Sequence, residues 1–452
     1  MGKGPSTRVR DTADQKAWYF YDWANSAYVT TVTTVLYGPY LTSVAEDAAG
    51  CQGAESCTNS LSLAGLSISA GSLFFYVVTF STLLSAFLLP LMGAYADLRH
   101  DKQKLMGHLA FVGAAATMLM FFVADGNWIL GSALLLIGNL ALGASLVVYD
   151  AILCDITPPD DRDRVSSRGW ALGYVGGGFL LIVNLAFYLL SPADFAEMAV
   201  RISLLSAGLW WGLWTLIPYF KIKNKADHVY QEIDVMRLAA GSFKQLATTF
   251  KELAMYPQTR LFLLAYLFFN DGVQTVIASA SIYGTEELGL KAESMIGAIV
   301  IVQIVAIAGA LFTGKMAAKY GAYKTVYYSL SVWMVVIVAG YFLPAGKATL
   351  FFILAAAIGF VLGGTQALSR SLFSQLVPRK REAEYFALYQ ACERGTSWLG
   401  TLTFGVVHQI TNSYRPAIIA LLAFFVIGGL LLRKVDIRQG ISEAGNEQPT
   451  IA

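Results

Sequence analysis

Charge is scarce in this chain. Of its 452 residues only 14% are Asp, Glu, Lys or Arg, whereas a soluble domain averages about 25%. Hydrophobic residues make up 56%, so a soluble fold of this composition could not cover its surface with polar groups. The composition therefore excludes an ordinary soluble protein and predicts an all-α polytopic membrane protein.

Histidine and cysteine are also rare, with four of each. The histidines are scattered and no Cys/His spacing is typical of a metal site, so we expect neither a metal nor another cofactor. Cys51 and Cys57 share one short polar loop. They could form a disulfide if the loop faces an oxidising space, and two free thiols are the alternative.

Nucleotide-binding signatures are absent as well. GALFTGKM at 309–316 nearly matches a P-loop, but it ends in Met and follows a membrane helix instead of a strand. We therefore expect that any transport is driven by a gradient and not by ATP hydrolysed on this chain. Nothing in the sequence suggests a nucleic-acid partner.

Long apolar stretches are abundant. Twelve are long enough to cross about 30 Å of hydrocarbon, and a polar stretch divides them six and six. We thus predict twelve transmembrane helices in two pseudo-symmetric six-helix bundles. The stretches are 17–44, 68–96, 105–124, 128–152, 169–190, 199–220, 259–285, 293–314, 324–344, 348–376, 384–408 and 415–433.

The polar segments complete the predicted domain organisation. The linker contains Phe243, Leu246, Phe250 and Leu253 at helical spacing, which predicts an amphipathic helix on the membrane surface. The expected parts are a disordered N-terminus at 1–16, bundles at 17–220 and 259–434, the linker at 221–258 and a tail at 435–452.

Lys and Arg are distributed unevenly between the two sides. With the N-terminus in the cytoplasm, all but six of the 32 fall in cytoplasmic segments. The positive-inside rule therefore predicts a multi-pass plasma (inner) membrane protein with both termini cytoplasmic, which puts Cys51 and Cys57 outside. The six exceptions are Lys291, Lys347 and Arg415 in outer loops, and Arg201, Arg370 and Arg394 within apolar stretches.

The two halves resemble each other. Asp22-x-x-Asn25 in the first stretch has a counterpart in Asp271-x-x-Gln274 in the seventh. GAYADLRHDKQK at 93–104 follows the second stretch, and GKMAAKYGAYKT at 314–325 follows the eighth. Paired repeats are a hallmark of secondary transporters, whose substrate site lies between the halves.

Several motifs point to one family. GAYADLRHDKQK resembles the inner-loop signature of the major facilitator superfamily, with Asp101 near the expected second glycine. YDWANSAY (21–28), YDAILCDITPPDDRDRVSSRGWALGYVGG (149–177) and GGTQALSRSLFSQLVP (363–378) together resemble the unknown-major-facilitator family, which includes the autophagy-related vacuolar amino-acid effluxers. The resemblance implies alternating access around a cavity lined by the first, fourth, seventh and tenth helices. For eukaryotic members it implies efflux of amino acids such as leucine.

Four charged residues fall on those four helices: Asp22, Asp150, Asp271 and Arg370. An ionisable group in a membrane span costs about 2.5–3.5 kcal/mol on insertion scales, so each should face a cavity or a partner. Asp22, Asp271 and Glu393 are candidates for proton coupling. Asp22 could instead be an interfacial acid favoured by the helix N-terminus, and Glu393 could belong to a structural ion pair.

Other charged residues are candidates for gating. We expect Asp150 and Arg370, which lie at matching depth in opposite halves, to pair across the inner gate, although each could pair within its own half. Arg394 could bind Glu393 or the partners of Arg370. By family analogy Asp97, in the signature with Arg99, would contact the N-terminus of the eleventh helix and hold the inner side closed.

Polar side chains within the membrane are candidate substrate contacts, with interhelical hydrogen bonds as the alternative. A cavity with amides, a few charges and aromatics suits a zwitterion or polar organic solute better than an apolar drug. The candidates are Asn25, Asn270, Asp271, Gln274, Gln303 and Gln366.

These features predict a monomeric secondary carrier of amino acids or related metabolites, with protons as a candidate coupling ion. A carrier of other cargo, such as a sugar, a drug or a lipid-linked molecule, is the alternative. A sensor or an intramembrane enzyme fits less well, because no compact His/Asp or Ser/Lys cluster occurs.

Overall fold

The computed structural model describes residues 10–51, 59–63, 65–223, 251–395 and 398–451. Within these ranges ten helical segments are long and apolar enough to span a membrane. The first predicted stretch is a continuous helix with a π-helical middle section, and the eleventh contains two described helices on either side of residues 396–397, which lie outside the described residues. One runs as α1 (Ala13–Ala27), the π-helix η1 (Tyr28–Leu36) and α2 (Tyr37–Ala48), and the other as α14 (Glu382–Gly395) and α15 (Trp398–Thr411).

The remaining helices follow the predicted order, except that α18 is an additional helix within the predicted tail. In the N-terminal half they are α3 (Leu73–Asp97), α4 (Lys102–Leu119), α5 (Trp128–Ile156), α6 (Arg162–Leu190) and α7 (Ala196–Lys221). In the C-terminal half they are α10 (Pro257–Ile282), the π-helix η6 (Tyr283–Glu287), α11 (Ala292–Tyr320), α12 (Ala322–Tyr341), α13 (Ala348–Leu376), α16 (Tyr414–Ala420), α17 (Leu422–Arg433) and α18 (Ile437–Glu443).

Short elements connect some of these helices. Four are 3-10 turns: η2 (Ala70–Ser72), η3 (Met120–Phe122), η4 (Pro159–Asp161) and η5 (Ala193–Phe195). The strands β1 (Ser60–Leu63) and β2 (Leu66–Ser69) form an antiparallel hairpin before α3, which the sequence patterns did not predict.

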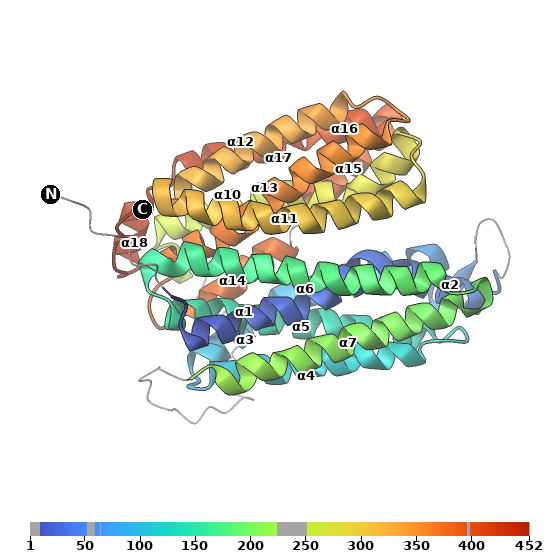
Figure 1. Ribbon diagram of the computed structural model, residues 1–452, viewed down its shortest axis with the longest axis horizontal. Helices are drawn as coiled ribbons and strands as arrows, with labels where there is room; N and C mark the ends of the chain where they lie inside the picture. The colour runs from blue at the N-terminus through green and yellow to red at the C-terminus, as the bar shows by residue number, and fades with distance from the viewer. Residues whose placement is uncertain (1–9, 52–58, 64, 224–250, 396–397, 452) are drawn as a thin grey trace.

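The helices form two bundles that lie one above the other in Figure 1, with α1–α7 below and most of α10–α17 above. The start of α1 and the whole of α18 lie at the same end of the molecule (Figure 1). We call this end the terminal side and the opposite end the far side. The fold is the predicted pair of helical bundles.

Contacts between the bundles are pseudo-symmetric. α3 packs against α14, and α6 packs against α11. In transmembrane order these are the second helix against the eleventh and the fifth against the eighth, which are equivalent pairs. α6 also contacts α13, and α5 contacts α14, so helices from both halves meet at the centre.

Small residues allow a close approach of α6 to α1 inside the N-terminal bundle. A Cβ on Gly173 would lie 2.8 Å from Ser26 Oγ, and one on Gly177 would lie 2.9 Å from Ser26 Cβ. Only glycine therefore lets α6 lie this close to α1. The four-residue spacing of Gly169, Gly173 and Gly177 serves packing, as the sequence predicted.

Residues 10–16 are ordered, although the sequence analysis predicted a disordered N-terminus over 1–16. Thr12 caps α1 by accepting the Gln15 N–H, and Gln15 returns a side-chain bond to the Thr12 N–H. Asp11 pairs with Arg164 and Arg168 of α6. Burial alone would raise the pKa of Asp11, but these two guanidinium groups outweigh it and lower that pKa.

Two sequence predictions fall largely outside the described residues. Cys51 is disulfide-bonded, and its predicted partner Cys57 lies in the undescribed stretch 52–58. Most of the predicted amphipathic linker helix falls within 224–250, which is also outside the described residues.

Candidate functional site

Arg370 of α13 joins the two bundles near the terminal side. Its guanidinium lies 3.2 Å from the Asp22 carboxylate of α1 and 3.3 Å from the Asp150 carboxylate of α5. All three side chains are at least nine-tenths buried. The Asp150–Arg370 contact was expected from matching depth in the two halves, whereas Asp22 is a second partner that the sequence had not paired with Arg370.

Ser166 of α6 supplies two further acceptors to Arg370. Arg370 Nε donates to Ser166 Oγ at 3.0 Å, and Nη2 donates to the Ser166 carbonyl at 3.2 Å. Every nitrogen of this guanidinium therefore has an acceptor in the opposite bundle, which a buried charge requires.

Aromatic rings surround the same guanidinium. Its central carbon lies 4.8 Å from the ring centre of Trp18 and 5.3 Å from those of Tyr149 and Trp170. Such cation–π contacts strengthen when they are desolvated. Tyr149 also donates from its hydroxyl to Asp22 Oδ2 at 2.7 Å, so Trp18 and Asp22 of α1 and Tyr149 of α5 surround this charge together.

Gln390 of α14 extends the group into a fifth helix. It donates to Asp150 Oδ2 at 2.7 Å and accepts from Arg394 Nε at 3.3 Å. The sequence reasoning missed Gln390, although its position four residues before Arg394 places both on one helix face. We call Arg370, Asp22, Asp150, Tyr149, Ser166 and Gln390 the Arg370 network.

The Arg370 network can act as a breakable closure. Arg370 and Gln390 belong to the C-terminal bundle, and their carboxylate partners belong to the N-terminal bundle. Separation of the bundles at this end would therefore break all of these cross-bundle bonds together. A buried ion pair adds little net stability over its separated, hydrated ions, so such a contact can open.

Asp97 makes a second closure at the end of α3. Its two carboxylate oxygens accept the backbone N–H groups of Ala383 and Glu384, each at 2.9 Å. These N–H groups belong to the first turn of α14, where the helix dipole favours an anion. The contact expected from the signature is thus present, and we call it the Asp97 latch.

Lys102 balances the acids around the Asp97 latch. Its ammonium lies 3.2 Å from Asp155, 3.7 Å from Asp97 and 4.0 Å from Glu382. Because Lys102 is on α4 and Glu382 is on α14, this cation also bridges the two bundles.

Further hydrogen bonds cross between the bundles on the terminal side. Ser166 Oγ donates to the Ala367 carbonyl and Arg162 Nη1 to the Ser374 carbonyl, both at 2.7 Å. Ser371 donates to Asp163. Beyond α18, the Thr450 N–H reaches Asp160 at 2.6 Å. Together with the network and the latch, these bonds join the two bundles on the terminal side.

A separate polar group lies between the bundles farther along α6. Tyr174 donates to Gln366 Oε1 of α13 at 2.6 Å. Gln303 of α11 lies beside Gly178, and its buried side-chain oxygen has no hydrogen-bond partner among the described residues. Tyr174 is eight residues beyond Ser166, or about 12 Å along the helix axis toward the far side. We call Tyr174, Gln303 and Gln366 the interbundle amide group.

Asp271 lies apart from these groups. It is fully buried, and its Oδ2 accepts the Gly400 N–H of α15 at 2.9 Å. Its Oδ1 has no partner among the described residues. Both α10 and α15 belong to the C-terminal bundle, so the Asp22/Asp271 sequence repeat does not bring Asp271 to the Arg370 network.

The other candidates have local surroundings. Asn25 donates to the Tyr21 carbonyl of its own helix at 2.7 Å, and Asn270 donates to the Glu393 carbonyl at 3.3 Å. Gln274, Glu393 and Arg394 are half-buried. The predicted substrate contacts are thus divided, and only Gln303 and Gln366 lie with Tyr174 between the bundles.

Arg99 pairs within its own loop. It lies 2.7 Å from Asp101 and donates to the Tyr95 hydroxyl. The Arg99 guanidinium holds the pKa of Asp101 below its usual range, with burial opposing the effect. Asp101, which stands near the expected second glycine of the signature, thus engages Arg99 within this loop. The described residues contain no cluster of three or more metal-ligating side chains.

Comparisons with known proteins agree on the class of molecule. The family model described as "Vacuole effluxer Atg22 like" matches residues 11–445. The uncharacterized MFS-type transporter YxiO of Bacillus subtilis is 33% identical over 97% of this chain and 99% of its own. Autophagy-related protein 22 of Yarrowia lipolytica is 24% identical over 84% of this chain and 78% of its own.

Solved structures agree on the fold. The proton:xylose symporter XylE superposes with a TM-score of 0.70 at 13% identity, over 96% of this chain and 98% of its own. The E. coli fucose:proton symporter FucP gives 0.67 at 13% identity, over 94% and 98%. At such identity the likeness concerns the fold alone.

Proposed function

The chain belongs to the Atg22-like vacuole effluxer family, and we propose that it moves a small polar organic solute across a membrane by alternating access. Its membership and its relatives make it an MFS-type membrane transporter and not an enzyme. The observation that carries the mechanism is the Arg370 network. It joins three helices of the N-terminal bundle to two of the C-terminal bundle by bonds that bundle separation would break.

The terminal side corresponds to the cytoplasm in this proposal. The loops on that side hold most of the Lys and Arg residues, and the positive-inside rule places such loops in the cytoplasm. With its terminal side closed, the structure is then the outward-facing or occluded member of the cycle. A monomer in the plasma membrane is the arrangement that we propose.

The interbundle amide group is the proposed substrate contact. Gln366 and Gln303 come from the C-terminal bundle and Tyr174 from the N-terminal bundle, so a solute held there would touch both. The unpartnered oxygen of Gln303 can accept one hydrogen bond. An ammonium group donates such bonds, which favours amino acids among polar solutes, as does the family resemblance to amino-acid effluxers.

Protons are the proposed coupling ion. Asp22 and Glu393 lie in or beside the Arg370 network, where a bound proton would weaken attraction to Arg370. Asp271 has one carboxylate oxygen without a partner in a fully buried position, which suits a carboxyl group that is protonated in part of the cycle.

Substrate binding can be measured by thermal shift of the purified protein against amino acids, sugars and nucleosides, because a ligand of the native state raises the melting temperature. For a compound that binds, Gln366→Ala should weaken affinity about tenfold, the effect of one lost hydrogen bond. Asn184→Ala is the matched control, since Asn184 bonds Ser206 inside the N-terminal bundle.

Equal affinity in native and Gln366→Ala protein would place the substrate elsewhere. Hits confined to sugars or nucleosides would replace amino acids as the substrate class while leaving the carrier mechanism intact.

Coupling can be measured as the dependence of substrate flux on an imposed pH gradient in proteoliposomes. Asp271→Asn should keep substrate exchange but lose its response to the gradient, because the amide cannot take up a proton. An unchanged response would exclude Asp271 from coupling.

A further inference from the structure

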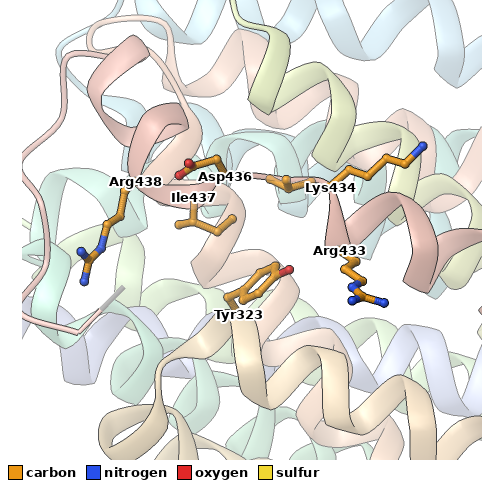
Figure 2. Close-up of a pocket in the computed structure, with 7 residues that line it drawn as sticks. Tyr323, Arg433, Lys434, Asp436, Ile437 and Arg438 are labelled. Atoms are coloured by element: carbon orange, nitrogen blue, oxygen red, sulfur yellow. The ribbon is translucent and has the colours of Figure 1, made fainter.

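A basic hollow lies on the terminal side where α17 gives way to α18. It measures about 350 Å³ and is lined by Tyr323 at the start of α12 and by residues 433–438. Figure 2 shows Arg433 and Arg438 on opposite sides of the Tyr323 ring in this view, with Asp436 and Ile437 between the labelled cations. We call this feature the α17–α18 hollow.

Its positive charge is unbalanced. Arg433, Lys434 and Arg438 are exposed, and none has an ion pair with another residue in the part of the chain that the structure describes. Asp436 is the one acid among the seven lining residues, and its carboxylate caps α18 by accepting the Gln439 N–H at 3.0 Å. Three cations therefore surround a space with a single acid that is already engaged.

An apolar stripe leads directly to these cations. On α17, Val426 and Leu430 are 40% and 56% exposed. Residues three and four apart share a helix face, so Leu430 lies beneath Arg433 and Lys434 and above Val426. On α12, Tyr328 is 63% exposed. An apolar surface thus ends at a basic hollow, which is the pattern of a bilayer boundary.

We propose that the α17–α18 hollow binds the headgroup of an anionic phospholipid in the leaflet on the terminal side. The phosphate group would contact Arg433, Lys434 and Arg438. The Tyr323 ring lines the hollow, and its hydroxyl already donates to the Leu432 carbonyl at 3.2 Å. The acyl chains would lie along Val426 and Leu430. A free phosphate ion satisfies only the first of these contacts, whereas a phospholipid satisfies both, and so the structure favours the lipid.

The site has a structural consequence. α18 buries Ile437 and Ile441 against the C-terminal bundle, and Asn446 just beyond it donates to the carbonyls of Gln375 and Val377 at the end of α13. A headgroup held by Arg433 and Arg438 would bridge α17 and α18 and so fasten this helix to the membrane.

The test uses the full chain in nanodiscs or neutral detergent and measures retained lipid by native mass spectrometry and by melting temperature. Phosphatidylglycerol is the anionic probe, phosphatidylcholine the neutral one and inorganic phosphate the free anion. The variant Arg433→Gln/Lys434→Gln/Arg438→Gln removes the three cations. Lys104→Gln/Lys315→Gln/Lys319→Gln removes three exposed cations elsewhere on the terminal side and is the matched control.

Native protein and the control should bind phosphatidylglycerol at least about tenfold more tightly than phosphatidylcholine, since each basic residue near a membrane surface contributes to anionic lipid binding. The hollow variant should lose that preference. Equal loss in the control would show unspecific surface charge and overturn the site. Competition by inorganic phosphate at the same concentration as the lipid would overturn the lipid assignment. Neither readout depends on transport, so failure of the proposed function would leave this test unchanged.

Discussion

Arg370→Gln should abolish substrate transport in proteoliposomes and lower the stability of the folded carrier. The substitution leaves the buried carboxylates of Asp22 and Asp150 without their cation. Removing one partner of a buried ion pair costs about 3–5 kcal/mol, because the remaining charge stays desolvated. Flux of the identified substrate and the melting temperature in detergent measure the two effects.

Neutralising the acids as well separates charge from packing. Arg370→Gln/Asp22→Asn/Asp150→Asn should recover most of the stability, since no unpaired charge remains. A simple exchange, Asp150→Arg with Arg370→Asp, should rescue only partly, because Asp22 would then face a second acid at position 370. Full rescue by the exchange would mean that Asp22 contributes nothing to the network.

Arg415→Gln is the matched control for Arg370→Gln. Arg415 pairs with Glu287 at 3.1 Å within the C-terminal bundle. Its loss should lower stability with little effect on the rate of transport per folded molecule. If both arginine variants lost transport to the same extent, the effect of Arg370 would be structural and not specific to the closure.

Gly93→Ala should open the terminal side. A Cβ on Gly93 would lie 2.4 Å from the Ala383 carbonyl oxygen and 2.8 Å from Glu384 Cα. Both belong to the backbone of α14, so they cannot move aside as a flexible side chain can. The substitution must push α3 away from α14. This weakens the Asp97 latch, because the Asp97 carboxylate lies at the end of α3 and its two N–H donors lie in α14.

Native Cys154 reports this opening. It lies on α5 with its sulfur 3.8 Å from the Ser374 carbonyl of the opposite bundle. In a Cys392→Ser background, Gly93→Ala should increase the rate of Cys154 labelling by N-ethylmaleimide at least about tenfold, which corresponds to a shift of 1.4 kcal/mol toward the open state.

Gly405→Ala provides the comparison for Gly93→Ala. Its added Cβ would meet no atom within 4 Å, so it changes helix propensity without a clash. The labelling rate should stay at the native value. A similar rate in all three proteins would show that the approach of α3 to α14 does not control access.

Single-sequence reasoning reached the scaffold and part of the site for identifiable physical reasons. Hydropathy predicted the helices because apolar length is set by bilayer thickness. The expectation that Asp150 pairs with Arg370 came from two other arguments. A charge in lipid requires a partner, and the repeat symmetry indicated that the two residues lie at matching depth. Asp97 was located by a loop signature whose mechanism is the attraction of an anion to a helix N-terminus.

The remaining contacts depend on helix rotation and local distortion, which hydropathy does not determine. Asp22 and Asp271 occupy equivalent sequence positions, yet one meets Arg370 and the other meets a backbone N–H of α15. Ser166 contributes through its carbonyl as well as its hydroxyl, and a backbone acceptor carries no sequence signal. The π-helix η1 also changes the direction in which the side chains after Tyr28 point, relative to a regular α-helix.

The central claim is that the Arg370 network keeps the terminal side closed in a carrier that opens to alternate sides. Pulsed electron–electron double resonance, which measures the distance between spin labels on opposite bundles, tests it most directly. Lys104 and Arg379 are exposed positions on the terminal side, and Asn127 and Lys347 are exposed positions on the far side. Cys154 and Cys392 are replaced by serine in all samples.

In the variant Arg370→Gln/Asp22→Asn/Asp150→Asn, which removes the charges of the network, the distance between labels at Lys104 and Arg379 should lengthen by several ångströms. The distance between labels at Asn127 and Lys347 should shorten. A terminal-side distance that stays at its native value in this variant would contradict the account.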